Sequence, residues 1–144
     1  MQRCFYLATK SHGYTYPNPL VGCVIVSGEK IISEGWHKKA GGDHAEVIAI
    51  NNIKEKKELK KSTLYVNLEP CCHTGKTPPC TELIIKSGIQ NVVIGCLDPN
   101  INVNGKGVKQ LVKNGIKVVV GVCMEKALEL NKRFYCFHQK KDPT

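Results

Sequence analysis

One segment, residues 69–80, sets strong limits on how this chain can fold. It places three cysteines, a histidine, a lysine and three prolines within a dozen positions. The short apolar run before it, residues 63–68, predicts a buried strand, and residues 81–87 after it predict a helix that stops at Gly88. Cys71 then lies at the exit of a strand and Cys80 at the entry of a helix. The prolines between them limit the entropy lost when both thiols converge on one point.

A third metal-ligand candidate stands upstream, in the sequence His44-Ala45-Glu46. A His-x-Glu followed by Pro-Cys and a later Cys is similar to the pattern of zinc deaminases, in which the Glu transfers protons and is not a ligand. The cysteines of that pattern are usually separated by two residues, whereas eight separate Cys71 from Cys80.

Length and cysteine content predict a single-domain protein in a reducing environment. A chain of 144 residues predicts a single domain, residues 1–144, large enough for one core. No apolar run approaches the roughly 18 residues of a membrane span, and residues 1–5 lack the long apolar core that a signal peptide is expected to have. Eight cysteines without an export signal favour the reducing cytoplasm, where clustered cysteines more often bind metal than form disulfides.

The formal charge of +9 raises the question of a nucleic-acid partner. Much of this charge lies in residues 54–61 and near the end of the chain, and mixed charge runs are usually solvated surface. RNA binding favours aromatic side chains among basic residues, but few of the nine aromatic residues lie near the lysine runs. We therefore predict no nucleic-acid partner, whereas a basic protein attracts phosphorylated small molecules.

The order of elements predicts an α/β fold. We expect helices over residues 2–12, from about 44, and over 81–87, 108–114 and 123–140, and strands over 21–26, 31–36, 63–68, 91–97 and 116–120. This order favours a three-layer α/β/α sandwich around a five-stranded mixed, mostly parallel sheet. Sites in such sheets lie beyond the carboxyl ends of the strands, so the loops after Trp36, Leu68 and Leu97 should open together if those strands run the same way.

His44 and Glu46 can share a site under one condition. Residues two apart in a regular helix point in nearly opposite directions, so both must lie in its first turn, with Asp43 as the N-cap and Val47, Ile48 and Ile50 facing inward. A zinc ion held by three protein ligands leaves one position for water. Glu46 would accept a proton as the water attacks a ring carbon that carries an amino group, and ammonia would leave.

Two alternatives concern the cysteines. Adjacent residues in an extended chain face opposite ways, and the Pro-Cys match selects Cys71 over Cys72. With Cys72 or His73 as a fourth ligand, the site would instead be a closed structural one in a non-catalytic zinc module, although closed sites usually combine two compact ligand pairs. The remaining cysteines are expected to be small buried hydrophobes: Cys4, Cys23, Cys96, Cys123 and Cys136.

Four segments, residues 17–26, 44–46, 69–80 and 98–100, resemble the diaminohydroxyphosphoribosylaminopyrimidine deaminases of riboflavin biosynthesis, members of the cytidine-deaminase-like superfamily. The resemblance covers essentially the whole chain, and its most specific part is the long cysteine spacing with His-Thr-Gly-Lys-Thr-Pro-Pro inside it. Nucleoside and tRNA base deaminases, the alternative class, resemble only the His-x-Glu and Pro-Cys parts.

The resemblance implies a zinc-dependent hydrolysis that converts the phosphorylated diaminopyrimidine intermediate to an amino-phosphoribosylamino-uracil and ammonia. It implies His44, Cys71 and Cys80 as zinc ligands and Glu46 as the proton carrier. It assigns Asn18 to the base, His37, His73 and Lys76 to the phosphate, and Asp98 and Asn100 to the ribose. It also suggests a homo-oligomer.

A reductase follows the deaminase in many members of this family. The present sequence stops at Thr144 and contains no glycine-rich dinucleotide fingerprint. We therefore expect either a separate reductase that acts next in the pathway or a sequence that is a domain-length piece.

Overall fold

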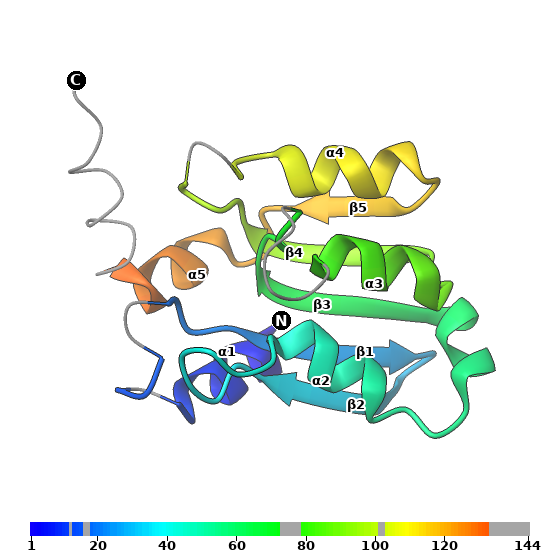
Figure 1. Cartoon of the computed structure of the whole chain (residues 1–144), viewed down its shortest axis with the longest axis horizontal. Helices are drawn as coiled ribbons and strands as arrows, with labels where there is room; N and C mark the ends of the chain where they lie inside the picture. The colour runs from blue at the N-terminus through cyan, green and yellow to red at the C-terminus, as the bar shows by residue number, and fades with distance from the viewer. Residues whose placement is uncertain (12, 16–17, 73–78, 101–102, 133–144) are drawn as a thin grey trace.

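The structure, a computed structural model, describes residues 1–11, 13–15, 18–72, 79–100 and 103–132. Its elements are α1 (Gln2–Thr9), β1 (Gly22–Ser27), β2 (Lys30–Trp36), α2 (Ala45–Asn51), the 3-10 helix η1 (Lys56–Lys61), β3 (Ser62–Leu68), α3 (Cys80–Ser87), β4 (Asn91–Cys96), α4 (Lys106–Lys113), β5 (Lys117–Val120) and α5 (Met124–Leu130). The five strands form one sheet in the order β2-β1-β3-β4-β5 (Figure 1).

The directions of the strands decide which loops meet. β3 is parallel to β4, and β4 to β5, whereas β1 is antiparallel to both of its neighbours, β2 and β3. Four strands therefore run one way and β1 runs against them, although only two of the four neighbouring pairs are parallel. The prediction of a mixed sheet is confirmed. The loops after β2, β3 and β4 consequently open at one edge of the sheet.

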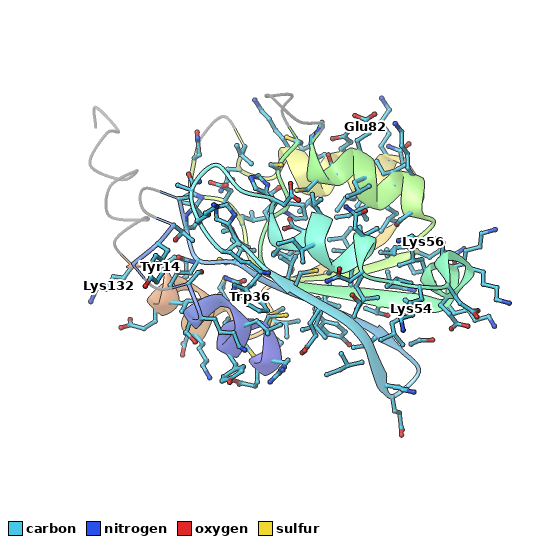
Figure 2. All side chains as sticks on the ribbon, turned by 60° about the horizontal axis from the view of Figure 1, so that its bottom comes forward. Tyr14, Trp36, Lys54, Lys56, Glu82 and Lys132 are labelled. Atoms are coloured by element: carbon cyan, nitrogen blue, oxygen red, sulfur yellow. The ribbon has the colours of Figure 1, made fainter. Side chains whose placement is uncertain are left out.

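Helices cover both faces of the sheet, as the sequence predicts. α2, α3 and α4 lie on one face, and α1 and α5 lie on the other (Figure 2). Side chains alternate between the faces along a strand, so Ile25 packs toward α2 while its neighbour Val24 packs against α1. The larger core lies under α2, α3 and α4 and includes Ala49, Leu64, Val66, Ile84, Val92, Ile94 and Leu111.

The close approach of α2 to β2 fixes where the start of α2 lies. A Cβ atom at Gly35 would lie 2.5 Å from the Ala45 carbonyl oxygen and 2.8 Å from the Ala49 nitrogen. A larger residue at this position would push the helix away from the sheet. Small side chains on the helix suit this contact, and Ala45 and Ala49 are fully buried.

Two details of α2 differ from the sequence expectation. His44, not Asp43, is the N-cap residue, because its extended backbone places it just outside the helix. Ile50 is buried as predicted, but Val47 and Ile48 are only half-buried. The close contact at Gly35 explains this second difference, since alanines occupy the buried face.

Other boundaries also differ. α1 ends at Thr9, and α4 begins at Lys106, two residues earlier than predicted. α5 is assigned over Met124–Leu130, and Phe134, Phe137 and Cys136 of the predicted longer helix lie outside the described residues. The prediction that Cys123 is buried is wrong, because this residue lies exposed directly before α5. Within the described ranges, no helix is long and apolar enough to cross a membrane.

The lysine-rich stretch, residues 54–61, lies at the opposite end of the sheet from the loops that follow β2, β3 and β4. It contains η1, which directly precedes β3, so it lies at the amino end of that strand. Figure 2 shows Lys54 and Lys56 at the opposite end of the molecule from Tyr14. The only buried residue of η1 is Leu59, which agrees with the prediction of a solvated surface for the charged residues around it.

Candidate metal centre

Three potential metal ligands come from the loops that follow β2 and β3. His44 directly precedes α2, with extended backbone angles of φ −71° and ψ 158°. Cys71 follows the buried carboxyl end of β3, and Cys80 is the first residue of α3. The Thr81 N–H donates to the Cys71 carbonyl oxygen at 3.1 Å. This bond joins the two ends of the segment from Cys71 to Cys80, which is called the cysteine loop below.

The three side chains converge on one point. The His44 Nδ1 atom lies 3.3 Å from the Cys80 Sγ atom and 3.7 Å from the Cys71 Sγ atom. All three ligand atoms lie within 4.8 Å of one another. Ligands bonded to a tetrahedral zinc ion at about 2.0–2.3 Å are separated from one another by about 3.5 Å. One nitrogen and two sulfur atoms at these separations therefore fit a zinc ion.

The two thiols differ in how readily they ionise. The pKa of Cys71 is lowered to about 4, mainly by a hydrogen bond from Cys80 and also by His44. The Cys80 backbone N–H donates to the same sulfur at 3.2 Å. The pKa of Cys80 is raised, because its bond to Cys71 and its burial keep the proton on its sulfur. Zinc ligands bind as thiolates, so a bound metal would displace any proton that remains on the two sulfur atoms.

Glu46 is a buried carboxyl group in the first turn of α2, with 4% of its surface exposed. Residues two apart within a helix point in nearly opposite directions. His44 lies outside the helix and has extended backbone angles, so its side chain can face the same site as that of Glu46. Burial, together with the charge on Cys71, raises the pKa of Glu46 to about 7. A carboxyl group that titrates near neutral pH can both accept and return a proton.

Asn18 and His37 form a polar pair beside His44. The Asn18 Nδ2 atom lies 3.4 Å from His37 Nε2, and His37 Nδ1 lies 3.1 Å from the Asp43 carbonyl oxygen. A carbonyl oxygen only accepts, so Nδ1 carries the proton and Nε2 accepts from the Asn18 amide. The rings of His37 and His44 meet edge to face, with their centroids 5.5 Å apart.

The environment of His37 differs from the one expected for a phosphate contact. The residue is 3% exposed, and burial lowers the pKa of its ring. The His37 ring is uncharged and both of its nitrogens already have hydrogen-bond partners. It is therefore better suited to orient the Asn18 side chain than to bind an anion. The other two residues expected at the phosphate, His73 and Lys76, lie outside the described residues.

Asp98 and Asn100 lie on the loop after β4, at the same edge of the sheet as the cluster, and both are half-buried. The Asn100 N–H donates to an Asp98 carboxylate oxygen at 2.9 Å. The Asn104 side-chain amide donates to the Asp98 carbonyl oxygen, also at 2.9 Å. These bonds form a compact turn in which the Asp98 side chain accepts a hydrogen bond from the backbone N–H two residues later.

Sequence reasoning did not single out the buried polar residues Asn67 and Glu69 at the end of β3. Asn67 accepts from the Gly22 N–H at 2.7 Å and donates to the Leu20 carbonyl oxygen at 3.0 Å, close in sequence to Asn18. Glu69 is 3% exposed and binds the loop after β4. A polar residue inside an apolar strand and an acid between a strand and a proline are the signals that point to these residues.

Comparison with known proteins defines the class. The family described as "Cytidine and deoxycytidylate deaminase zinc-binding region" matches residues 1–96, a span that includes the three-ligand cluster and Glu46. The chain belongs to this family of zinc-binding deaminases. Zinc is the cofactor of the domain, and its reaction class is hydrolysis of a C–N bond.

Individual relatives confirm the predicted resemblance. A diaminohydroxyphosphoribosylamino-pyrimidine deaminase of Buchnera aphidicola subsp. Schizaphis graminum is 52% identical over 135 residues, 94% of this chain and 90% of that protein. The riboflavin biosynthesis protein RibD of Aquifex aeolicus is 52% identical over 99% of this chain and 40% of its own length.

A solved structure from Thermotoga maritima, a diaminohydroxyphosphoribosylaminopyrimidine deaminase/5-amino-6-(5-phosphoribosylamino)uracil reductase, is similar with a TM-score of 0.92 and 49% identity. The similarity covers 99% of this chain and 41% of that one. The present chain thus spans about two fifths of the length of the Aquifex and Thermotoga proteins.

Replacement of Cys71 by serine should abolish stoichiometric zinc binding, because a hydroxyl is a far weaker zinc ligand than a thiolate. Cys72→Ser is the matched control, since it makes the same change one residue along, outside the three-ligand cluster. It should retain about one zinc ion per chain. Elemental analysis of dialysed protein measures both, and the reverse pattern would assign the ligand to Cys72.

Glu46→Gln should change how the stability of the zinc-free chain depends on pH. The pKa of this carboxyl rises from its ordinary value of 4.5 to about 7 on folding. Between these values the folded state holds a proton that the unfolded state has lost, so the free energy of unfolding falls as pH rises. Relative to the glutamine variant, the unaltered chain should lose about 3 kcal/mol across this window.

Urea unfolding in the presence of a chelator, from pH 4.5 to 8, measures this difference. Glu82→Gln is the control, since Glu82 pairs with Lys86 on the outer side of α3 at 2.9 Å and is partly exposed. Its curve should follow that of the unaltered chain. Parallel curves for the unaltered chain and Glu46→Gln would show that the Glu46 carboxyl is not perturbed.

Proposed function

We propose that this chain removes the ring amino group of a phosphoribosylated diaminopyrimidine by hydrolysis in riboflavin biosynthesis. The products would be an amino-phosphoribosylamino-uracil and ammonia. The observation that carries the proposal is the three-ligand cluster, with its ligand atoms within 4.8 Å, next to the buried carboxyl of Glu46. Three protein ligands are typical of catalytic zinc sites, which keep a position for water. The names of the similar proteins supply the substrate class.

His44, Cys71 and Cys80 would hold the zinc ion. Two thiolates and one neutral imidazole balance the charge of the divalent cation. When bound, zinc acts as a Lewis acid that makes water reactive near neutral pH. Among the described residues, the metal-ligating cluster contains these three side chains, which favours a catalytic site over a closed structural one.

Glu46 would move the protons. Its carboxylate accepts a proton from water while the water oxygen bonds to the ring carbon that carries the amino group. The protonated Glu46 then gives this proton to the adjacent ring nitrogen. A second transfer takes the new hydroxyl proton through Glu46 to the amino nitrogen, so the C–N bond breaks and ammonia leaves a carbonyl behind. One water is consumed and Glu46 returns to its starting state.

The polar residues around the cluster would bind the substrate. Asn18, oriented by His37, presents both a donor and an acceptor to the base. Asp98 and Asn100 would hydrogen-bond the ribose hydroxyls from the loop after β4. His73 and Lys76 are the proposed phosphate contacts, because a phosphate monoester favours cationic donors.

The proposed reaction also implies a second enzyme that uses its product. The name of the Thermotoga protein joins the deaminase to a reductase. We extend this to a reductase that acts next on the product of the present chain, either as a separate protein or within the same polypeptide. A cytoplasmic location and a homo-oligomeric state stay predictions, based on the cysteine content and on the family resemblance.

A base in a nucleoside or in RNA is a second candidate substrate, and one surface feature favours it. The Nζ atoms of Lys10 and Lys38 lie 4.9 and 5.0 Å from the centre of the Trp36 ring, next to His37 in the sequence. Tyr14 is 72% exposed. Aromatic rings among cations are typical binding platforms for unpaired bases. This arrangement is not evident from the sequence, because Trp36 and Tyr14 lie outside the lysine runs of residues 54–61 and of the end of the chain.

A substrate panel distinguishes the candidates. The zinc-loaded chain should release ammonia from the phosphorylated diaminopyrimidine in strong preference to its dephosphorylated form, cytidine, deoxycytidylate and single-stranded RNA. Glu46→Gln should keep its zinc and lose about 10²- to 10⁴-fold in kcat, the usual contribution of a positioned acid–base group. Glu82→Gln should retain full activity.

Two results would contradict the proposal. Faster deamination of RNA or of a nucleoside than of the phosphorylated compound would favour the second candidate. Undiminished turnover by Glu46→Gln would remove Glu46 from proton transfer.

A further inference from the structure

Glu69 is a buried carboxylate that joins two loops of the site. It follows β3, two residues before Cys71, and is 3% exposed. Its Oε1 atom accepts hydrogen bonds from the backbone N–H groups of Asp98 at 3.1 Å and Gly105 at 3.0 Å. Its Oε2 atom accepts from the Val108 N–H at 3.1 Å. Removal of this acceptor would leave three partly buried N–H groups without their partner, which is costly.

The first turn of α4 packs directly against Pro70, the residue before Cys71. A Cβ atom at Gly107 would lie only 2.4 Å from the Pro70 carbonyl oxygen, so the absence of a side chain permits this contact. The hydroxyl of Thr81, the residue after Cys80, donates to Gln110 Oε1 on α4 at 2.7 Å. α4 is therefore fastened next to both cysteine ligands.

The loop that Glu69 holds is the loop that carries the proposed ribose contacts. The backbone N–H of Asp98 bonds to Glu69, while the carboxylate of the same residue accepts from the Asn100 N–H at 2.9 Å. A displacement of the Glu69 carboxylate would therefore shift both Asp98 and Asn100. The described residues of the loop after β4, 98–100 and 103–105, together with the first turn of α4, 106–108, are called the substrate-side loop below.

We propose that Glu69 is a positioning residue that couples the zinc site to the substrate-side loop. Zinc fixes Cys71, the short connection through Pro70 fixes Glu69, and Glu69 fixes the backbone of the loop. Such coupling is reciprocal, so a substrate held by the loop also steadies the zinc ligands. The substrate half of this inference rests on the proposed function, whereas the zinc half does not.

Backbone hydrogen exchange tests the zinc half without any substrate. Addition of one equivalent of zinc to the chelator-treated chain should slow exchange of the Asp98, Gly105 and Val108 amides by about tenfold, because these amides must open to exchange. Glu69→Gln keeps the size of the side chain but turns an NH₂ group toward one of the donors. The zinc effect should then fall below about twofold.

Glu82→Gln is the matched control for this experiment, because it makes the same chemical change on the outer side of α3. It should show the full zinc effect. The unaltered chain is a test in itself: equal exchange of the three amides with and without zinc overturns the inference, even if Glu69→Gln does not fold. An undiminished zinc effect in folded Glu69→Gln also overturns it.

Steady-state kinetics test the substrate half. Glu69→Gln should raise KM for the phosphorylated diaminopyrimidine about tenfold and lower kcat less than about threefold, with one zinc ion still bound per chain. A lowered kcat at unchanged KM would indicate a smaller folded fraction, hence a purely structural role, and overturns the inference. If the unaltered chain releases no ammonia from this compound, the proposed function fails, and the exchange experiment still decides the role of Glu69.

Discussion

The convergence of one imidazole and two sulfur atoms is the constraint on which the rest of the structure depends. His44 lies 27 residues before Cys71 and 36 before Cys80, so local geometry cannot bring them together. The sheet does so, because β2 and β3 run in the same direction with the reversed strand β1 between them. Their following loops meet at one edge, where Gly35 allows α2 to approach β2 closely.

Two glutamates near this cluster are almost equally buried but have different environments. Glu69 accepts three backbone hydrogen bonds, which compensate for its burial and make it part of the scaffold. For Glu46, burial beside Cys71 raises the pKa to about 7. A proton can therefore enter and leave Glu46 near neutral pH, whereas Glu69 acts through the backbone groups that it holds. Two residues of one type thus differ in role because of their surroundings.

The sequence predicted those parts of the site that depend on local order. The apolar run before Pro70, the prolines of the cysteine loop and Gly88 predicted a strand, a loop and a helix. Helix periodicity predicted that His44 and Glu46 share a site only at the start of the helix. The structure has Glu46 in the first turn, but His44 is the N-cap residue directly before it. Contacts set by tertiary register could not be predicted. The bonds of Glu69 to a loop about 30 residues away are one example, and the contact of the buried His37 ring with Asn18 is another.

The zinc environment in the folded chain tests the central claim most directly. X-ray absorption at the zinc edge reports the type and distance of each ligand atom. With His44, Cys71 and Cys80 as the protein ligands, the spectrum should show two sulfur atoms at about 2.3 Å and two nitrogen or oxygen atoms at about 2.0 Å, one of them exchangeable with solvent. A spectrum with three or four sulfur atoms, or with a second histidine in place of the exchangeable ligand, would contradict the account.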